Sequence, residues 1–176
     1  GNQNLFLVEN IIPDYLSISE LKYILTSLIK EKVSIRDIVF IFEKINDLTY
    51  LEDKELLLSH LRTALRRQIS ASLCFEKDNI IRAYELSAEF LKIFAEIDSD
   101  SASDAVRIEK SKVKAVIKKI NEISAGQPDM KELILLAPFE LRHIISLVLS
   151  AYISNIRVIS REEILPEYNL KISGKI

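Results

Sequence analysis

The spacing of hydrophobic residues in this 176-residue chain changes near residue 70. Before that point, apolar residues recur at intervals of three and four, which places them on one face of an α-helix. After it, residues 133–136 and 156–159 are almost entirely apolar, as is typical of strands covered on both faces. We therefore predict a predominantly helical α+β fold, with a helical bundle subdomain at residues 1–70 and a small mixed α/β subdomain with a short helix-backed sheet at residues 71–176.

The first subdomain is expected to hold three amphipathic helices after a lead-in segment at residues 1–16. Ser17 and Glu20 have the spacing of a capping box, in which each side chain accepts a hydrogen bond from the backbone N–H of the other residue. Ser34 is the expected N-cap of the second helix. The third helix is predicted at about residues 52–70. Short loops between the helices favour a compact antiparallel bundle.

The second subdomain is expected to open with a hairpin. Residues 71–76 and 80–86 have strand character, and residues 77–79 between them are suited to a turn. Residues 168–176 alternate weakly and predict a terminal edge strand. Helices that back the sheet are expected at residues 87–97, 109–124 and 138–153.

A parallel strand pair is predicted within the same subdomain. The helix between residues 133–136 and 156–159 supplies the crossover that parallel pairing requires. Ser160 and Glu163 repeat the capping-box spacing directly after the second strand. The sheet is therefore expected to contain at least one β-α-β unit.

Composition excludes several classes of function. A net charge of −2 gives no general attraction to nucleic acid, and no apolar run approaches the roughly 18 residues of a membrane-spanning helix. A single cysteine excludes an internal disulfide, and with two histidines it argues against a metal site. Glycine-rich phosphate loops and nucleophile motifs are absent from the sequence. We expect no enzymatic activity, cofactor or metal ion.

The individual residues that could carry chemistry have simpler structural interpretations. His60 lies on an apolar helix face, and His143 follows Arg142 on a predicted helix. Cys74 lies in a strand pattern with no adjacent cation to lower the pKa of its thiol. Three aspartates resemble calcium ligands but lack the spacing and central glycine of an EF-hand; they are Asp98, Asp100 and Asp104.

A cluster of arginines is the charged feature of most interest. Arg62 and Arg66 are four residues apart and would share one side of the third helix, with Arg67 beside them on or near its outer face. The cluster is either a solvated surface or a patch that pairs with carboxylates of a neighbouring subunit through bidentate contacts. A nucleic-acid site is less favoured, because the lysine run at residues 110–119 has no aromatic residues within it.

Several segments in order resemble the flagella/HR/invasion proteins export pore family, the large export-gate component of bacterial type III secretion systems. The resemblance is most specific over residues 10–70, where LIKEKVSIRD stands at residues 28–37 and LRTALRRQI at residues 61–69. Residues 133–138 and 156–164 resemble a strand and a C-terminal segment of the family. Residues 98–109 show no recognisable motif of the family.

The resemblance implies a C-terminal cytosolic part of an integral inner-membrane protein, on the cytoplasmic face of the membrane. Gly1 in place of an initiator Met agrees with sequence missing upstream, and any membrane contact would be made by that missing part. The implied role is non-catalytic docking in a nonameric ring of the full-length protein. The implied partners are the export ATPase complex and its stalk protein, chaperone–substrate complexes and a gatekeeper.

The resemblance also gives the candidate subunit contacts. They are Arg36, Asp37, Lys44, Arg62, Arg66 and Arg67. Chaperone docking in the family involves subdomains that are largely missing here, so this chain alone is expected to bind chaperones weakly or not at all. The Asp/Ser-rich loop favours an injectisome over a flagellar system. Two alternatives are a cytosolic α+β adaptor unrelated to secretion and a non-catalytic fragment of a larger enzyme.

Overall fold

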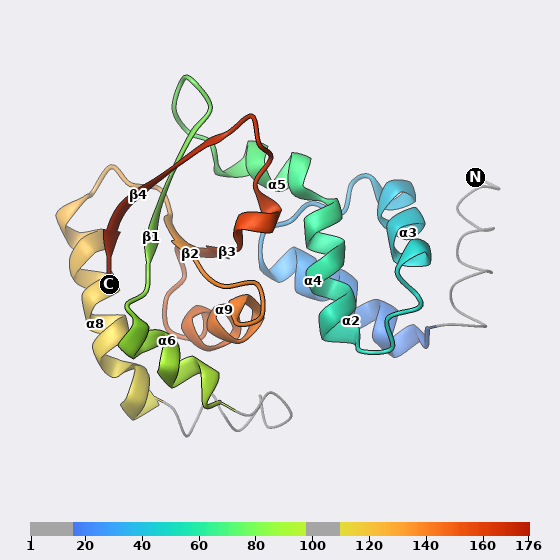
Figure 1. The fold of residues 1–176 in the computed structure, drawn as a ribbon, viewed down its shortest axis with the longest axis horizontal. Helices are drawn as coiled ribbons and strands as arrows, with labels where there is room; N and C mark the ends of the chain where they lie inside the picture. Colours follow the sequence, from blue (N-terminus) through green and yellow to red (C-terminus); the bar gives the residue numbers. More distant parts are fainter. Residues whose placement is uncertain (1–15, 98–109) are drawn as a thin grey trace. The chain divides into compact units, whose positions relative to one another are not determined.

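The computed structural model describes residues 16–97 and 110–176 (Figure 1). The chain divides into two compact units, Gly1–Ser72 and Leu73–Ile176, and each is described by itself. The lead-in segment up to residue 15 and the aspartates of the 98–104 loop lie outside the described residues. Within the described ranges, no helix is both long enough and apolar enough to cross a membrane.

The first unit is helical. The helices among its described residues are α2 (Ile18–Lys30), α3 (Ile38–Asp47), α4 (Lys54–Ala64) and α5 (Arg66–Leu73), the last of which ends one residue beyond the unit. Buried apolar side chains from α2, α3 and α4 form its centre, including Ile24, Leu28, Ile41, Ile45, Leu57, Leu58 and Leu61. Each of these three helices contributes one apolar stripe, as their periodicity predicts.

Two helix starts show how local sequence sets the boundaries. The predicted capping box at α2 is confirmed: the Glu20 N–H donates to Ser17 Oγ at 3.1 Å, and the Ser17 N–H donates to the Glu20 carboxylate at 2.8 Å. The expected Ser34 cap is wrong. Asp37 caps α3 by accepting the Phe40 N–H at 3.3 Å, while Ser34 Oγ accepts the Arg36 N–H within the preceding loop.

The predicted third helix is two helices. The N–H of Leu65 donates to the carbonyls of both Leu61 and Arg62, and α4 ends there. A new helix, α5, then continues to Leu73, so the strand expected at residues 71–76 is wrong. Leu65, Ile69 and Leu73 are all buried at four-residue spacing, and this spacing keeps the segment helical.

The second unit holds a four-stranded parallel sheet in the order β3-β2-β1-β4 (Figure 1). Its strands are β1 (Ile80–Glu85), β2 (Leu133–Leu136), β3 (Ile156–Ile159) and β4 (Asn169–Lys175). The predicted parallel pair is confirmed, with Leu133 opposite Ile156 and Leu136 opposite Ile159. The predicted terminal edge strand is also confirmed as β4.

The hairpin expected before β1 is wrong. Asp78 and Asn79 do make a turn with φ values of 64° and 53°, the left-handed region that Asn and Asp tolerate. The turn nevertheless connects α5 to β1, and both neighbours of β1 run parallel to it. Because α5 extends to Leu73, no strand precedes the turn to form the other arm.

Helices of the second unit share one core with the sheet. They are α6 (Ala88–Ala95), α8 (Lys110–Gly126) and α9 (Arg142–Ser150). Phe94, Val116 and Ile145 from these helices join Leu135 and Val158 from the strands in a single buried cluster. The predominantly helical α+β class predicted from the sequence is therefore confirmed.

A buried ion pair joins the turn after β3 to helix α9 in the second unit. After β3, a short 3-10 turn, η2 (Arg161–Glu163), carries Glu163 into the interior. The Glu163 carboxylate accepts the Ser160 N–H at 3.2 Å, which is the glutamate half of the predicted capping box. It also lies 3.7 Å from Nε of Arg142. Because Arg142 belongs to α9, this pair ties η2 to a core helix.

Candidate functional site

The candidate functional sites within the described residues are two exposed surfaces of the first unit and a groove in the second. Among the described residues, no group of three or more His, Cys, Asp or Glu side chains is arranged to hold a metal ion. His60 and His143 are half-buried and lie in different units. Cys74 lies in the loop between α5 and β1, not in a strand, and its thiol is 3.4 Å from the carbonyl oxygens of Glu76 and Ile80.

Arg62 does not lie on an outer face, so that expectation is wrong. Its side chain is 1% exposed, and Nη1 lies 3.7 Å from Oε2 of Glu31 at the end of α2. The break at Leu65 also places Arg62 and Arg66 in different helices. Arg62 is therefore positioned to join α4 to α2 inside one unit.

The remaining predicted contacts are distributed over three segments. Lys44 of α3 lies 3.7 Å from Asp47 and 5.3 Å from the ring centre of Phe40. Asp37 is used as the cap of α3. The three exposed cations among the predicted contacts are Arg36, Arg66 and Arg67.

One hydrogen bond links the two segments that carry these three exposed arginines. Gln68 of α5 donates its side-chain amide to the carbonyl of Ser34 at 2.9 Å. This bond holds the loop that carries Arg36 against the helix that carries Arg66 and Arg67. We call Arg36, Arg66 and Arg67 the arginine patch; its position suits pairing with carboxylates of a partner.

Exposed apolar residues on α2 form a second feature of the first unit. Ile18 is 70% exposed and Ile29 is 55% exposed. Eleven residues are close to three full helical turns, so the two side chains project from the same side of α2. The apolar spacing of α2 predicts that Ile29 lies on the inner stripe, and its exposure shows that this prediction is wrong. Exposed large apolar side chains on one side of a helix make that side a candidate protein contact surface.

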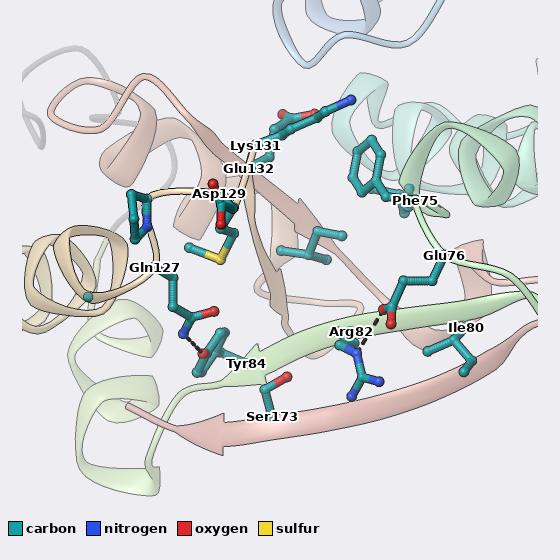
Figure 2. Close-up of a pocket in the computed structure, with 15 residues that line it drawn as sticks. Phe75, Glu76, Ile80, Arg82, Tyr84, Gln127, Asp129, Lys131, Glu132 and Ser173 are labelled. Atoms are coloured by element: carbon teal, nitrogen blue, oxygen red, sulfur yellow. Dashed lines mark hydrogen bonds and ion pairs between the residues drawn. The ribbon is translucent and has the colours of Figure 1, made fainter.

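The second unit contains a groove of about 700 Å³ beside β1 (Figure 2). One wall is β1 with the loop that precedes it, and the other is the segment at residues 126–132 between α8 and β2. The side-chain amide of Gln127 donates to the Tyr84 hydroxyl at 2.7 Å across one end. Nζ of Lys131 lies 5.6 Å from the ring centre of Phe75, a cation–π contact that also joins the two walls.

Both apolar and charged groups line the groove. Phe75 is 53% exposed, and Arg82 donates to the Glu76 carboxylate at 2.7 Å (Figure 2). The ring of Tyr84 packs on Gly174 of β4, where an added Cβ would meet the ring at 3.4 Å. A groove of this size and mixed lining is in the range that binds small molecules or short peptide segments.

Sequence reasoning missed this groove for a specific reason. It placed a strand at residues 71–76, where Leu73 ends a helix and Phe75 stands in a loop. The buried series Leu65, Ile69 and Leu73 was the available signal, because its four-residue spacing is helical.

Comparison with known proteins settles the family. The model of the FHIPEP family matches residues 1–169. The chain belongs to the FHIPEP family. This confirms the export-pore resemblance carried by the motifs at residues 28–37 and 61–69.

Relatives of the chain are flagellar and secretion proteins. The flagellar biosynthesis protein FlhA of Bacillus subtilis strain 168 is 31% identical over 175 residues, which cover 96% of this chain and 25% of FlhA. The nonameric EscV cytosolic domain from the type III secretion system matches 99% of this chain and 52% of the solved chain, with a TM-score of 0.79 and 22% identity. CdsV of Chlamydia pneumoniae, solved with CdsO, matches with a TM-score of 0.72 and 23% identity over 98% of this chain and 52% of its own.

The chain corresponds to only part of each of these proteins. It spans about a quarter of FlhA and about half of the solved EscV and CdsV chains. The similarity to EscV and CdsV shows a shared fold.

Proposed function

We propose that this FHIPEP chain is a docking and ring-forming portion of the inner-membrane export gate of a bacterial type III secretion system. In this role it takes part in protein export by contacting neighbouring subunits and partner proteins on the cytoplasmic face of the membrane. The observation that carries the proposal is the surface of the first unit. The described apolar residues of α2, α3 and α4 form a buried core, yet Ile18 and Ile29 are exposed on one side of α2.

The arginine patch gives this surface a means of specific pairing. Arg36, Arg66 and Arg67 are exposed, and planar guanidinium groups bind carboxylates in a fixed two-point geometry. Apolar burial would supply affinity and the arginines would set the register between subunits. The nonameric assembly of EscV supports a ring in which this unit contacts another copy.

Further partners are part of the same proposal. The structure of CdsV with CdsO supports a binding role for the family's cytosolic region. For this chain we propose the export ATPase complex and its stalk protein, together with chaperone–substrate complexes and a gatekeeper.

The assembly role is testable on the complete cytosolic region of the protein. Replacing Ile18→Ser and Ile29→Ser together should reduce self-association in sedimentation velocity, because the change removes exposed apolar area without touching the core. The double replacement Leu147→Ser and Ile172→Ser is the matched control, since these exposed residues lie in the second unit. Unchanged assembly in the α2 variant would refute the assignment of this surface.

A further inference from the structure

In the sheet of the second unit, β1 and β2 pair over only part of the length of β1. β1 pairs with β4 along its whole length, from Ile80 opposite Asn169 to Glu85 opposite Lys175. Its pairing with β2 is limited to Tyr84 and Glu85. The first four residues of β1 therefore have a strand partner on one side only, and the groove lies beside them (Figure 2).

Backbone directions show which groups of β1 face the groove. The Asn169 N–H donates to the Asn79 carbonyl at 2.7 Å, so Asn79 points its carbonyl toward β4. Backbone groups of successive strand residues point to alternate sides. Ile81 and Ala83 therefore face β4, while Ile80 and Arg82 present their N–H and C=O groups on the side of β2.

The opposite wall offers the same kind of groups. The Leu133 N–H donates to the Asn155 carbonyl at 2.9 Å, which directs Leu133 toward β3. By the same alternation, Glu132 and Ile134 turn their backbone groups toward β1. The bridge between Tyr84 and Leu135 already uses the Ile134 carbonyl, so an added strand would pair with the main chain of β1.

We propose that this groove binds an extended peptide segment of a partner protein, which adds as a strand to Ile80–Arg82 of β1. Main-chain groups at strand spacing are complemented by another extended main chain, and strand addition is an established mode of peptide recognition. The inference concerns a surface of the second unit, separate from the assembly surface of the first.

Side chains of the groove indicate which segments fit. Arg82 is paired with Glu76 at 2.7 Å, and Glu132 lies 3.7 Å from Arg157, so the two pairs leave little net charge to attract a strongly charged ligand. Phe75, at one end, offers an exposed ring. The fitting occupant is an extended segment with alternating β-branched residues, which favour strand conformation.

The probe for this proposal is the acetylated and amidated peptide Lys-Thr-Val-Thr-Val-Thr-Lys, titrated into the nitrogen-15-labelled chain and followed by NMR. We expect amide shifts centred on Arg82 and Ile134, and slower hydrogen exchange at the Arg82 amide. The control peptide carries a methyl group on the backbone nitrogen of every Thr and Val. The affinity of this control peptide should be lower by at least about tenfold, because it has lost the N–H donors that strand pairing uses.

Two variants of the chain separate main-chain from side-chain recognition. Arg82→Pro removes an N–H that faces the groove and not β4, and should weaken peptide binding about tenfold. Arg82→Ala keeps that N–H and should retain binding. The two peptides on the unaltered chain provide the test even if the proline variant folds poorly.

Three results would overturn the proposal. One is the absence of shifts at Arg82 with millimolar peptide, and another is equal binding of the methylated peptide. The third is a set of shifts that appears when the chain is concentrated without peptide, because a second copy of the chain would then be the occupant.

Discussion

Arg142 of α9 and Glu163 of η2 form an ion pair in the interior of the second unit. Their side chains are 2% and 1% exposed, and Nε of Arg142 lies 3.7 Å from Oε2 of Glu163. Arg142 also donates from Nη1 to the Val158 carbonyl at 3.1 Å. One guanidinium group thus contacts both the end of β3 and the turn that follows it.

Removing one partner of this pair should destabilise the chain severely. Glu163→Ala leaves the Arg142 charge buried without its carboxylate, which costs about 3–5 kcal/mol. Urea unfolding followed by circular dichroism measures the loss. Glu162→Ala removes an exposed neighbour of the same type and should change the unfolding free energy by less than about 0.5 kcal/mol. Equal effects of the two substitutions would show that the pair has no special role.

A second stability prediction separates Arg62 from the arginine patch. Arg62→Ala should lower the free energy of unfolding by about 3 kcal/mol, because it removes a buried side chain together with its ion pair to Glu31. Arg66→Ala changes an exposed residue and should fall within about 0.5 kcal/mol of the unaltered chain. Thermal or urea unfolding checks both. A stable Arg62→Ala chain would contradict the structural role given to Arg62.

The pKa of Tyr23 should be measurably raised. Burial raises the pKa of Tyr23, and the nearby carboxylate of Glu55 raises it further. In the unfolded chain the pKa of a tyrosine is about 10, so the folded chain keeps the Tyr23 proton to higher pH. The raised pKa therefore stabilises the folded chain fully at pH values below about 10. This stabilisation is lost as pH rises through the pKa of Tyr23 in the folded chain.

NMR of ring-labelled tyrosine tests this shift, with Tyr23→Phe to assign the signal. Glu55→Gln should lower the pKa of Tyr23 toward the ordinary value. Glu43→Gln is the control, since Glu43 is not among the carboxylates that act on Tyr23. A Tyr23 signal that titrates together with unfolded-chain tyrosine would contradict the burial of this residue.

Features set by local sequence were predictable. Ser17 and Glu20 form their capping box because both partners lie within one helical turn. Residues 133–136 and 156–159 were identified as paired strands because both faces of each are buried. Such signals depend on burial and on contacts close in sequence.

Features that depend on distant residues were not predictable. Arg62 was assigned to the surface because charged residues are rarely buried, and its partner Glu31 lies on another helix. The groove arises because β1 meets β2 only at Tyr84 and Glu85, a register that no single segment encodes. The strand expected at residues 71–76 failed because buried Leu73 extends α5.

The most direct test of the central claim is the mass of the assembled cytosolic region, measured by sedimentation velocity with the arginine patch reversed. Arg36→Glu combined with Arg66→Glu should shift the protein from a ring to smaller species, because the surface would repel the carboxylates it is proposed to bind. Lys112→Glu combined with Lys114→Glu makes the same charge change on exposed lysines of α8 and should leave the ring intact. If the patch-reversed protein assembles as fully as the lysine control, the arginine patch is not a subunit contact and the account is wrong.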